Sequence, residues 1–248
     1  MRPPTVLTSP NHDARPSGMP IDMLVLHYTG MTTGEVAIGR LRDASAKVSA
    51  HYVVEEDGRI FQLVPEERRA WHAGVAYWRG HRDINGRSIG IELVNPGHEF
   101  GYRAFPKAQM SALVDLAAAI VKRRRIPARN VVGHSDVAPE RKEDPGELFE
   151  WERLAGAGVG LWPKIRKRWF GGRSFETFNF GPDEHHQTIA QAQKNLVAWG
   201  YDVPTNGVLD ARTMRTLVAF QRHFRPSNID GRLDGETASR LASLLEQV

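Results

Sequence analysis

The sequence of 248 residues contains no cysteine. This absence excludes disulfide bonds, thiolate nucleophiles, iron–sulfur clusters, cysteine-ligated zinc and lipid attachment through an N-terminal cysteine. Any bound metal ion must therefore be held by histidine, aspartate or glutamate side chains. The sequence also lacks any apolar run close to the roughly 18 residues that a transmembrane helix needs. Its first residues have no apolar stretch typical of a secretion signal.

A large charge of either sign is also missing. The formal net charge is +4, with 25% charged and 41% hydrophobic residues. This composition is typical of a globular protein, and the chain has no basic tail of the kind that binds nucleic acids. The basic run KRRR (122–125) follows a helical pattern, where cations offset the helix dipole. We therefore expect no nucleic-acid partner and no membrane insertion.

Strand and helix patterns alternate along the first two thirds of the chain, which predicts an α/β fold. In the run SIGIELV, the alternation places Ile89, Ile91 and Leu93 on one face of a strand and Glu92 on the other. The turn Asp57-Gly58 between two apolar runs is typical of a hairpin. Strands are expected over 22–28, 50–54, 59–64, 88–94 and 130–134, and helices over 32–44 and 105–121.

The last quarter of the chain has only helical patterns. Residues 170–184 contain three glycines and a proline without helical periodicity, which is typical of a linker. We therefore divide the chain into a larger domain (1–169), a linker (170–184) and a smaller all-α domain (185–248). Its three helices are expected over 186–199, 210–224 and 235–245.

Two predicted strands each end in a histidine, His27 and His134, and Asp144 follows in a loop rich in proline and charge. Two histidines and one carboxylate match the three protein ligands of a catalytic zinc site, whose fourth position is left to water. The spacing alone does not decide the question, because a histidine at the end of a strand is more often structural.

Four blocks follow one another along the chain: LVLHYTG (24–30), SAHYVVEEDGRIFQLVPEERRAWHAG (49–74), SIGIELVNPG (88–97) and VVGHSDVAPERKEDPG (131–146). Together they resemble the zinc-dependent N-acetylmuramoyl-L-alanine amidases, whose fold is shared with the peptidoglycan recognition proteins. The resemblance implies a mixed central sheet flanked by helices, with Zn²⁺ held by His27, His134 and Asp144. It also implies that Glu92 is the catalytic glutamate and that Lys142 is the lysine that precedes the last zinc ligand.

The physical chemistry of these residues agrees with the roles that the resemblance implies. Glu92 can take a proton from the attacking water and pass it to the leaving amine. Lys142 lies two residues before Asp144, so that in an extended segment both side chains project to one side, where the ammonium can stabilise an oxyanion. Without the resemblance, Glu92 fits a solvated strand residue and Lys142 a surface charge.

Further residues in or beside the matched blocks are candidates for lining a sugar–peptide groove. Trp71 can stack on the substrate, and Arg79 can pair with a substrate carboxylate. The alternative is that Trp71 and His51 are core residues or support the metal ligands. The full candidate set is Tyr28, His51, Trp71, His72, Arg79 and Asn85.

The C-terminal segment resembles the helical peptidoglycan-binding domain that is fused to many cell-wall hydrolases, through LVAFQRHF (217–224) and IDGRLDGETASRL (229–241). Its first half, QAQKNLVAWGYDVPTNG, departs from that pattern. Glycan binding and a structural cap on the catalytic domain are both compatible with this match. The acidic and basic residues of the segment balance, which argues against an electrostatic grip on an anionic wall.

The leading hypothesis is a zinc amidase that cleaves the amide between N-acetylmuramic acid, or its 1,6-anhydro form, and L-alanine of the stem peptide. Anhydro-muropeptides are its expected partners, in muropeptide recycling. A cytoplasmic location is expected, or a periplasmic one if the natural N-terminus is longer. The alternatives are an exported amidase that acts on intact wall and a non-catalytic module that binds muropeptides without cleaving them.

Overall fold

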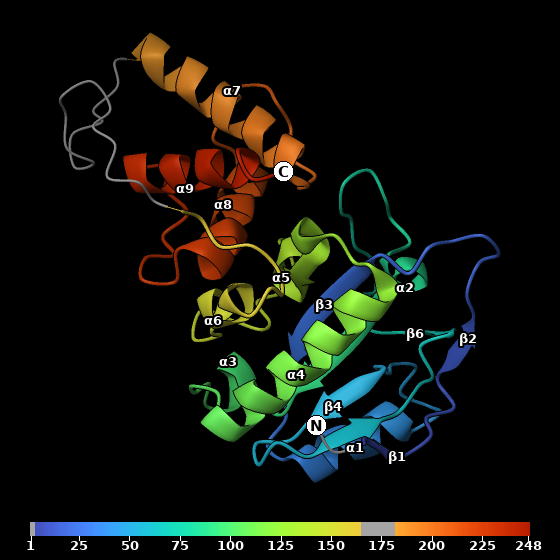
Figure 1. Ribbon diagram of the computed structural model, residues 1–248. Coiled ribbons are helices and arrows are strands. Elements are labelled where there is room, and N and C mark those ends of the chain that lie inside the picture. Colours follow the sequence, from blue (N-terminus) through green and yellow to red (C-terminus); the bar gives the residue numbers. More distant parts are fainter. Residues whose placement is uncertain (1–2, 165–181) are drawn as a thin grey trace.

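A six-stranded mixed β-sheet forms the centre of the N-terminal part of the molecule (Figure 1). The computed structural model describes residues 3–164 and 182–248. The order of the strands in the sheet is β1-β5-β4-β7-β3-β8. The strands are β1 (Thr5–Val6), β3 (Met23–Tyr28), β4 (Tyr52–Val54), β5 (Ile60–Gln62), β7 (Ser88–Leu93) and β8 (Val131–Gly133), and a separate ribbon pairs β2 (His12–Ala14) with β6 (Arg68–Ala70).

The four neighbouring strands β4, β7, β3 and β8 run parallel to one another. Only β5 is antiparallel to its partner β4, through the expected hairpin. Because parallel strands point their carboxyl ends toward one edge, the residues that follow β3, β7 and β8 come together there. The expected mixed sheet flanked by helices is confirmed.

One face of the sheet is covered by the long helix α4 (Lys107–Arg124), which lies across the sheet in Figure 1. Ile89, Ile91 and Leu93 of β7 pack into the hydrophobic cluster under α4. The predicted alternation in this strand is therefore confirmed, because Glu92 lies on the other face, among the residues that line a cavity. The helical residues in the same cluster include Met110, Leu113, Leu116, Ala117 and Ile120.

The other face of the sheet is covered by two different parts of the chain. Helix α1 (Gly34–Arg42) packs over β4 and β5, and its N-cap residue Thr33 accepts a hydrogen bond from the Val36 N–H. Segment 71–87, which ends in the short helix α2 (Ile84–Arg87), covers the area around β3 and β8. The remaining short elements of this region are α3 (Gly97–Phe100), the 3₁₀ turn Ala128–Asn130, α5 (His134–Val137) and α6 (Trp151–Gly156).

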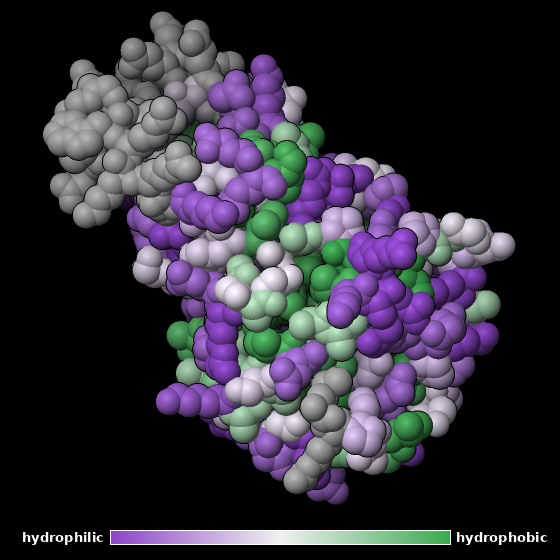
Figure 2. Space-filling model, viewed as in Figure 1, coloured by the Kyte–Doolittle hydropathy of each residue, from purple (hydrophilic) through white to green (hydrophobic). Residues whose placement is uncertain are grey.

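The three C-terminal helices pack directly on the larger domain (Figure 1). One hydrophobic cluster contains Val25 and Val132 of the sheet together with Trp199 and Phe220 of the C-terminal helices. On the face drawn in Figure 2, hydrophobic residues gather toward the middle of the molecule, while its outer parts are mostly hydrophilic. The helices are α7 (Pro182–Trp199), α8 (Ala211–Phe224) and α9 (Gly235–Leu245), close to the predicted positions.

Two sequence-based expectations about element boundaries need comment. His134 does not end a strand, because β8 stops at Gly133 and His134 begins α5. The predicted linker (170–184) lies outside the described residues except for its last three, which already belong to α7. No helix within residues 3–164 and 182–248 combines the length and hydropathy that crossing a lipid bilayer requires.

The basic run at the end of α4 has a specific partner that the sequence did not indicate. Glu66 is only 3% exposed, and its carboxylate pairs with the guanidinium groups of Arg123 and Arg124. The Tyr52 hydroxyl donates a further hydrogen bond of 2.9 Å to this carboxylate. Burial alone would raise the pKa of Glu66, but the hydrogen bonds from Arg123, Arg124 and Tyr52 bring this pKa below its usual value.

We expect Glu66→Gln to lower the free energy of unfolding by about 1–3 kcal/mol at pH 7, because Arg123 loses its carboxylate partner and Arg124 loses one of its two. A carboxyl whose pKa is lowered by folding stabilises the protein above its unfolded pKa of about 4.3 and loses this effect as the pH falls through the folded pKa. The deficit should therefore shrink between pH 5 and pH 3 in urea titrations. Glu67→Gln, at a side chain 73% exposed, is the control and should change little. An equal deficit at both pH values would contradict the assignment.

Candidate functional site

A cavity of ≈ 670 Å³ opens at the carboxyl ends of β3, β7 and β8, on the side of the sheet that carries α1. Each of these strands contributes one chemically important residue: His27 at the end of β3, Glu92 at the end of β7 and His134 directly after β8. His27 and Glu92 are neighbours in the ladder between β3 and β7. Asp144, from the loop that follows α5, completes the wall.

Three acceptor atoms converge at the bottom of this cavity. The distance from His27 Nδ1 to His134 Nδ1 is 3.0 Å, and Asp144 Oδ2 lies 2.9 Å from the first and 3.0 Å from the second. All three side chains are buried, with 1%, 4% and 6% of their residue surface exposed. Within the described parts of the chain, this is the one group of histidine and acidic side chains close enough to hold a metal ion together.

The hydrogen bonds around the two histidines determine which ring nitrogen carries the proton. His134 Nε2 lies 3.0 Å from the carbonyl oxygen of Ala73 and must donate to it. Ser88 donates its hydroxyl to the carbonyl of Ile84, so its oxygen accepts from His72 Nε2 at 3.1 Å. His72 Nδ1 is then an acceptor.

The proton on His27 follows from the same chain of hydrogen bonds. His27 Nε2 lies 3.0 Å from His72 Nδ1 and donates to it. In both His27 and His134, Nδ1 therefore presents a lone pair to the centre of the cluster.

Two lone pairs and one carboxylate oxygen facing one another without a proton between them repel unless a cation lies among them. Burial, together with the neighbouring His134, lowers the pKa of His27 to about 4, so that its ring is neutral at pH 7. Tetrahedral zinc with bonds of about 2.0–2.1 Å places its ligand atoms about 3.3 Å apart. The cluster therefore fits a divalent metal ion.

Glu92 lines the same cavity and has the properties of a general base. Its Oε2 atom is buried and has no hydrogen-bond partner. Burial and the nearby Asp144 raise the pKa of Glu92 well above its usual value, while Lys142 acts in the opposite direction. A carboxyl whose pKa is raised binds a proton more readily than a surface carboxyl, which suits a group that must take up a proton and pass it on. Lys142 lines the same cavity.

Three of the six expected groove residues line the cavity: Tyr28, Trp71 and His72. The Tyr28 hydroxyl is held by His98 Nδ1 at 3.0 Å, and burial raises the pKa of this tyrosine to about 12. His72 is close to the sheet, because a Cβ atom on Gly90 would come within 2.6 Å of its ring. Glycine at position 90 therefore makes room for the ring that supports His27.

The other three expected groove residues lie away from the cavity. His51 has no exposed surface, accepts a hydrogen bond from the Gly90 N–H through Nδ1, and lies 3.1 Å from the Arg68 carbonyl through Nε2. Arg79 donates to Asn130 Oδ1 and lies beside the C-terminal helices. A groove-lining role does not fit either position.

Asn85, the third of these residues, supports the cluster from behind. Its Oδ1 accepts hydrogen bonds from the backbone N–H groups of His72 at 3.1 Å and Ala73 at 2.8 Å. These are the two residues that accept the protons of His27 and His134. Asn85 therefore fixes the segment that orients both histidine rings.

Several residues that line the cavity were not indicated by the sequence, among them Arg40, Phe100 and Arg141. Arg40 has an exposed side chain on α1 for which the described part of the chain provides no hydrogen-bond or ion-pair partner. Phe100 is 50% exposed and also lines the cavity. Arg141 donates to the carbonyl groups of Ala73 and Val75. Only Arg141 had a signal in the sequence, because it lies in the matched block 131–146 between His134 and Asp144.

Comparison with known families gives two matches. A family model described as N-acetylmuramoyl-L-alanine amidase matches residues 17–147. A second model, described as a putative peptidoglycan binding domain, matches residues 185–241. The first match covers the segments that carry His27, Glu92, His134 and Asp144.

Individual proteins are similar to the chain over nearly its whole length. N-acetylmuramoyl-L-alanine amidase AmiD of Escherichia coli is 39% identical over 240 residues, which is 92% of this chain and 83% of AmiD. The structure of AmiD with the substrate anhydro-N-acetylmuramic acid-L-Ala-D-gamma-Glu-L-Lys superposes with a TM-score of 0.80 over 93% of this chain and 91% of that chain, at 38% identity.

Two further relatives extend the comparison. AmpDh3 of Pseudomonas aeruginosa, in complex with anhydromuramic pentapeptide, has a TM-score of 0.81 and 38% identity and covers 94% of both chains. The 1,6-anhydro-N-acetylmuramyl-L-alanine amidase AmpD of Escherichia coli is 36% identical over 164 residues, which is 59% of this chain and 87% of AmpD. AmpD aligns with a much smaller share of this chain than AmiD or AmpDh3 does.

We expect His72→Phe to weaken the affinity for Zn²⁺ about ten- to a hundredfold, because His27 loses the acceptor that orients its ring while the volume is kept. Competition with a chromogenic chelator measures the zinc dissociation constant. His81→Phe, at an exposed histidine outside the cavity, is the matched control and should bind zinc as the parent protein does. An unchanged affinity in His72→Phe would show that the chain from His27 to Ser88 is irrelevant to the metal.

Proposed function

Because the chain belongs to the N-acetylmuramoyl-L-alanine amidase family, we propose that it hydrolyses the amide between anhydro-N-acetylmuramic acid and L-alanine of soluble muropeptides. The observation that carries this proposal is the convergence of three unprotonated acceptor atoms beside an unpaired buried carboxyl group, at the bottom of a wide cavity. Two relatives that resemble the chain over more than 90% of its length are described in complex with anhydro-muramic peptides.

In this proposal His27, His134 and Asp144 hold a zinc ion. Zinc is preferred because two imidazoles and one carboxylate are the donor set of many catalytic zinc sites. When bound, the ion supplies the Lewis acidity that makes water nucleophilic near neutral pH. The chain orients its ligands through Ala73 and His72, so that each imidazole offers Nδ1.

Glu92 and Lys142 act on the substrate amide in the same proposal. Glu92 takes a proton from the attacking water and transfers it to the nitrogen of the leaving L-alanine. Its unpaired Oε2 and its raised pKa support this role. Lys142 places a positive charge at the cavity wall, where negative charge develops on the carbonyl oxygen during attack.

The wall of the cavity offers groups suited to both parts of a muropeptide. Tyr28 and Trp71 provide aromatic surface for stacking on the sugar or the peptide. Arg40 takes over the role that was expected of Arg79, since its guanidinium lines the cavity and can pair with a carboxylate of the stem peptide. His51 and Asn85 support this wall from behind.

Intact peptidoglycan is a second candidate substrate, because residues 185–241 match a putative peptidoglycan binding domain. An enzyme with such a domain can act on intact wall. The non-catalytic alternative has no such support, because the metal cluster and the carboxyl group of Glu92 are both present. The cytoplasmic location expected from the sequence would accompany a soluble substrate, and it stays a prediction.

We expect Glu92→Gln to lower turnover by about 10²–10⁴-fold while zinc stays bound, because the amide keeps the shape of the side chain but cannot accept the proton. Turnover is followed as release of free stem peptide from anhydro-muropeptide, and zinc content by elemental analysis. Glu35→Gln, on an exposed position of α1, serves as the control. Full activity of Glu92→Gln would remove this residue from the mechanism.

Mass spectrometry of products separates the two substrate forms. The zinc-loaded protein is incubated in parallel with soluble anhydro-muropeptide and with intact sacculi, and we expect free stem peptide from the soluble substrate at a much higher rate. Equal or faster release from sacculi would favour an enzyme of the intact wall. Release from neither substrate, with zinc bound, would contradict the proposed function.

A further inference from the structure

Two of the three proposed metal ligands lie on one short segment, residues 134–147, which is placed between the sheet and the C-terminal helices. His134 begins this segment and Asp144 lies near its end. The Ser135 N–H donates a hydrogen bond of 2.9 Å to the carbonyl of Asp144, which ties the two ends of the segment together. Whatever holds this segment therefore also holds both ligands.

The side chain that anchors the segment to the rest of the protein is Asp136, which is 1% exposed. Its carboxylate accepts three hydrogen bonds: from the Gly133 N–H at 2.7 Å, the Tyr201 hydroxyl at 2.5 Å and His223 Nδ1 at 2.7 Å. The first donor belongs to β8, and the other two belong to the C-terminal domain. Two residues after His134, the two domains thus share one buried carboxylate.

The imidazole of His223 is itself held in a stack of rings. It lies against Trp151, with ring centroids 3.6 Å apart and an interplanar angle of 21°, and against Phe224 at 3.7 Å and 8°. Trp151 also closes the space above Gly133, where an added Cβ atom would come within 3.3 Å of the indole and 2.8 Å of Pro145. The residues next to each ligand are therefore packed without free space.

The neighbouring residue on α8 holds the other end of the segment. Arg222 pairs with Glu143 at 2.8 Å and lies 3.6 Å from a carboxylate oxygen of Glu147. These two glutamates flank the turn that contains Asp144. Consecutive residues of α8, Arg222 and His223, thus reach both ends of the ligand-bearing segment.

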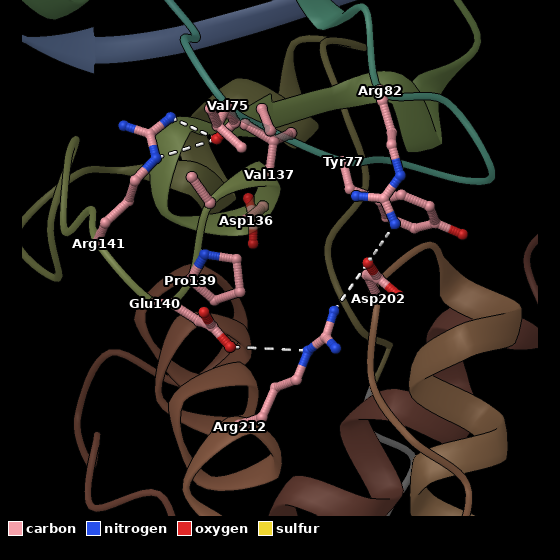
Figure 3. A pocket seen from close by; sticks show the side chains of 12 residues that line it. Val75, Tyr77, Arg82, Asp136, Val137, Pro139, Glu140, Arg141, Asp202 and Arg212 are labelled. Atoms are coloured by element: carbon pink, nitrogen blue, oxygen red, sulfur yellow. Dashed lines mark hydrogen bonds and ion pairs between the residues drawn. The ribbon is translucent and has the colours of Figure 1, made fainter.

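The rest of the interface surrounds a cavity of ≈ 170 Å³, which is lined by residues of both domains (Figure 3). Asp136 lies at its wall, and Asp202 bridges Arg82 at 3.1 Å and Arg212 at 2.8 Å. Arg212 also lies 3.7 Å from a carboxylate oxygen of Glu140. These ion pairs are partly exposed, so that they contribute little fixed geometry compared with the buried contacts of Asp136.

We propose that Tyr201 and His223 of the C-terminal domain are positioning residues of the metal centre, which fix His134 and Asp144 through the shared carboxylate of Asp136. The proposal rests on the proposed zinc site and assigns to the C-terminal domain a part in building it. Groups behind the ligands are known to set metal affinity, because ligands that are held in place lose no freedom on binding. A merely structural contact between domains would affect unfolding but leave the zinc affinity of the folded protein unchanged.

The test compares Tyr201→Phe with Arg82→Gln in the full-length protein. Both changes remove an interaction across the interface, but only the first touches Asp136. We expect Tyr201→Phe to weaken zinc binding about tenfold or more in chelator competition and to shift the absorption bands of the cobalt-substituted protein. Arg82→Gln should match the parent protein in both measurements. An unchanged zinc affinity and cobalt spectrum in folded Tyr201→Phe overturns the proposal.

A pair of substitutions at His223 keeps the proposal testable if Tyr201→Phe does not fold. His223→Asn keeps an N–H donor close to the position of Nδ1, and His223→Leu removes it. The proposal expects tighter zinc binding in His223→Asn than in His223→Leu, and equal affinities overturn it. If the parent protein itself binds no zinc, the proposed function fails; if it binds zinc and the variants do not differ, only the role of the C-terminal domain fails.

Discussion

The structure depends on one electrostatic constraint, the meeting of two imidazole lone pairs and a carboxylate oxygen within about 3 Å of one another. Such a cluster is stable only if a cation or a proton lies between the three atoms. The imidazole protons are not available for this, because both are used in hydrogen bonds to Ala73 and His72. The parallel arrangement of β3, β7 and β8 brings the groups together, because their carboxyl ends share one edge of the sheet. Ala73, His72 and Asn85 then decide which atom each histidine presents.

The parts of this arrangement that the sequence predicted are those that depend on local periodicity. Alternation in β7 was enough to place Glu92 opposite Ile89 and Ile91, and the three C-terminal helices were visible from their apolar spacing. The roles of His51 and Arg79 could not be predicted in this way. Both lie near matched blocks, but the path of segment 71–87 over the sheet, which depends on tertiary packing, decides that one is buried and the other lies beside the C-terminal helices. Arg40 faces the cavity for the same reason, from a helix whose sequence shows only a surface cation.

The C-terminal domain can serve an enzyme of this family in two ways, by binding peptidoglycan and by supporting the site in the larger domain. Its similarity to putative peptidoglycan binding domains concerns its own fold. Its contacts with the larger domain concern the catalytic site, because one hydrophobic cluster and one buried carboxylate run through the interface. A domain fastened in this way moves with the proposed metal ligands, so that any polymer it bound would be held in a fixed relation to the cavity. Substrate binding and metal geometry would then be parts of one rigid unit.

The central claim is that His27, His134 and Asp144 form a three-ligand zinc site with an open fourth position. The most direct measurement is an anomalous difference map at the zinc absorption edge, from crystals grown with one equivalent of zinc. We expect a single strong peak about 2.0–2.2 Å from His27 Nδ1, His134 Nδ1 and Asp144 Oδ2, with the fourth coordination position open to the cavity that Glu92 lines. A peak elsewhere, coordination through Nε2 of either histidine, or the absence of zinc from this cluster would contradict it.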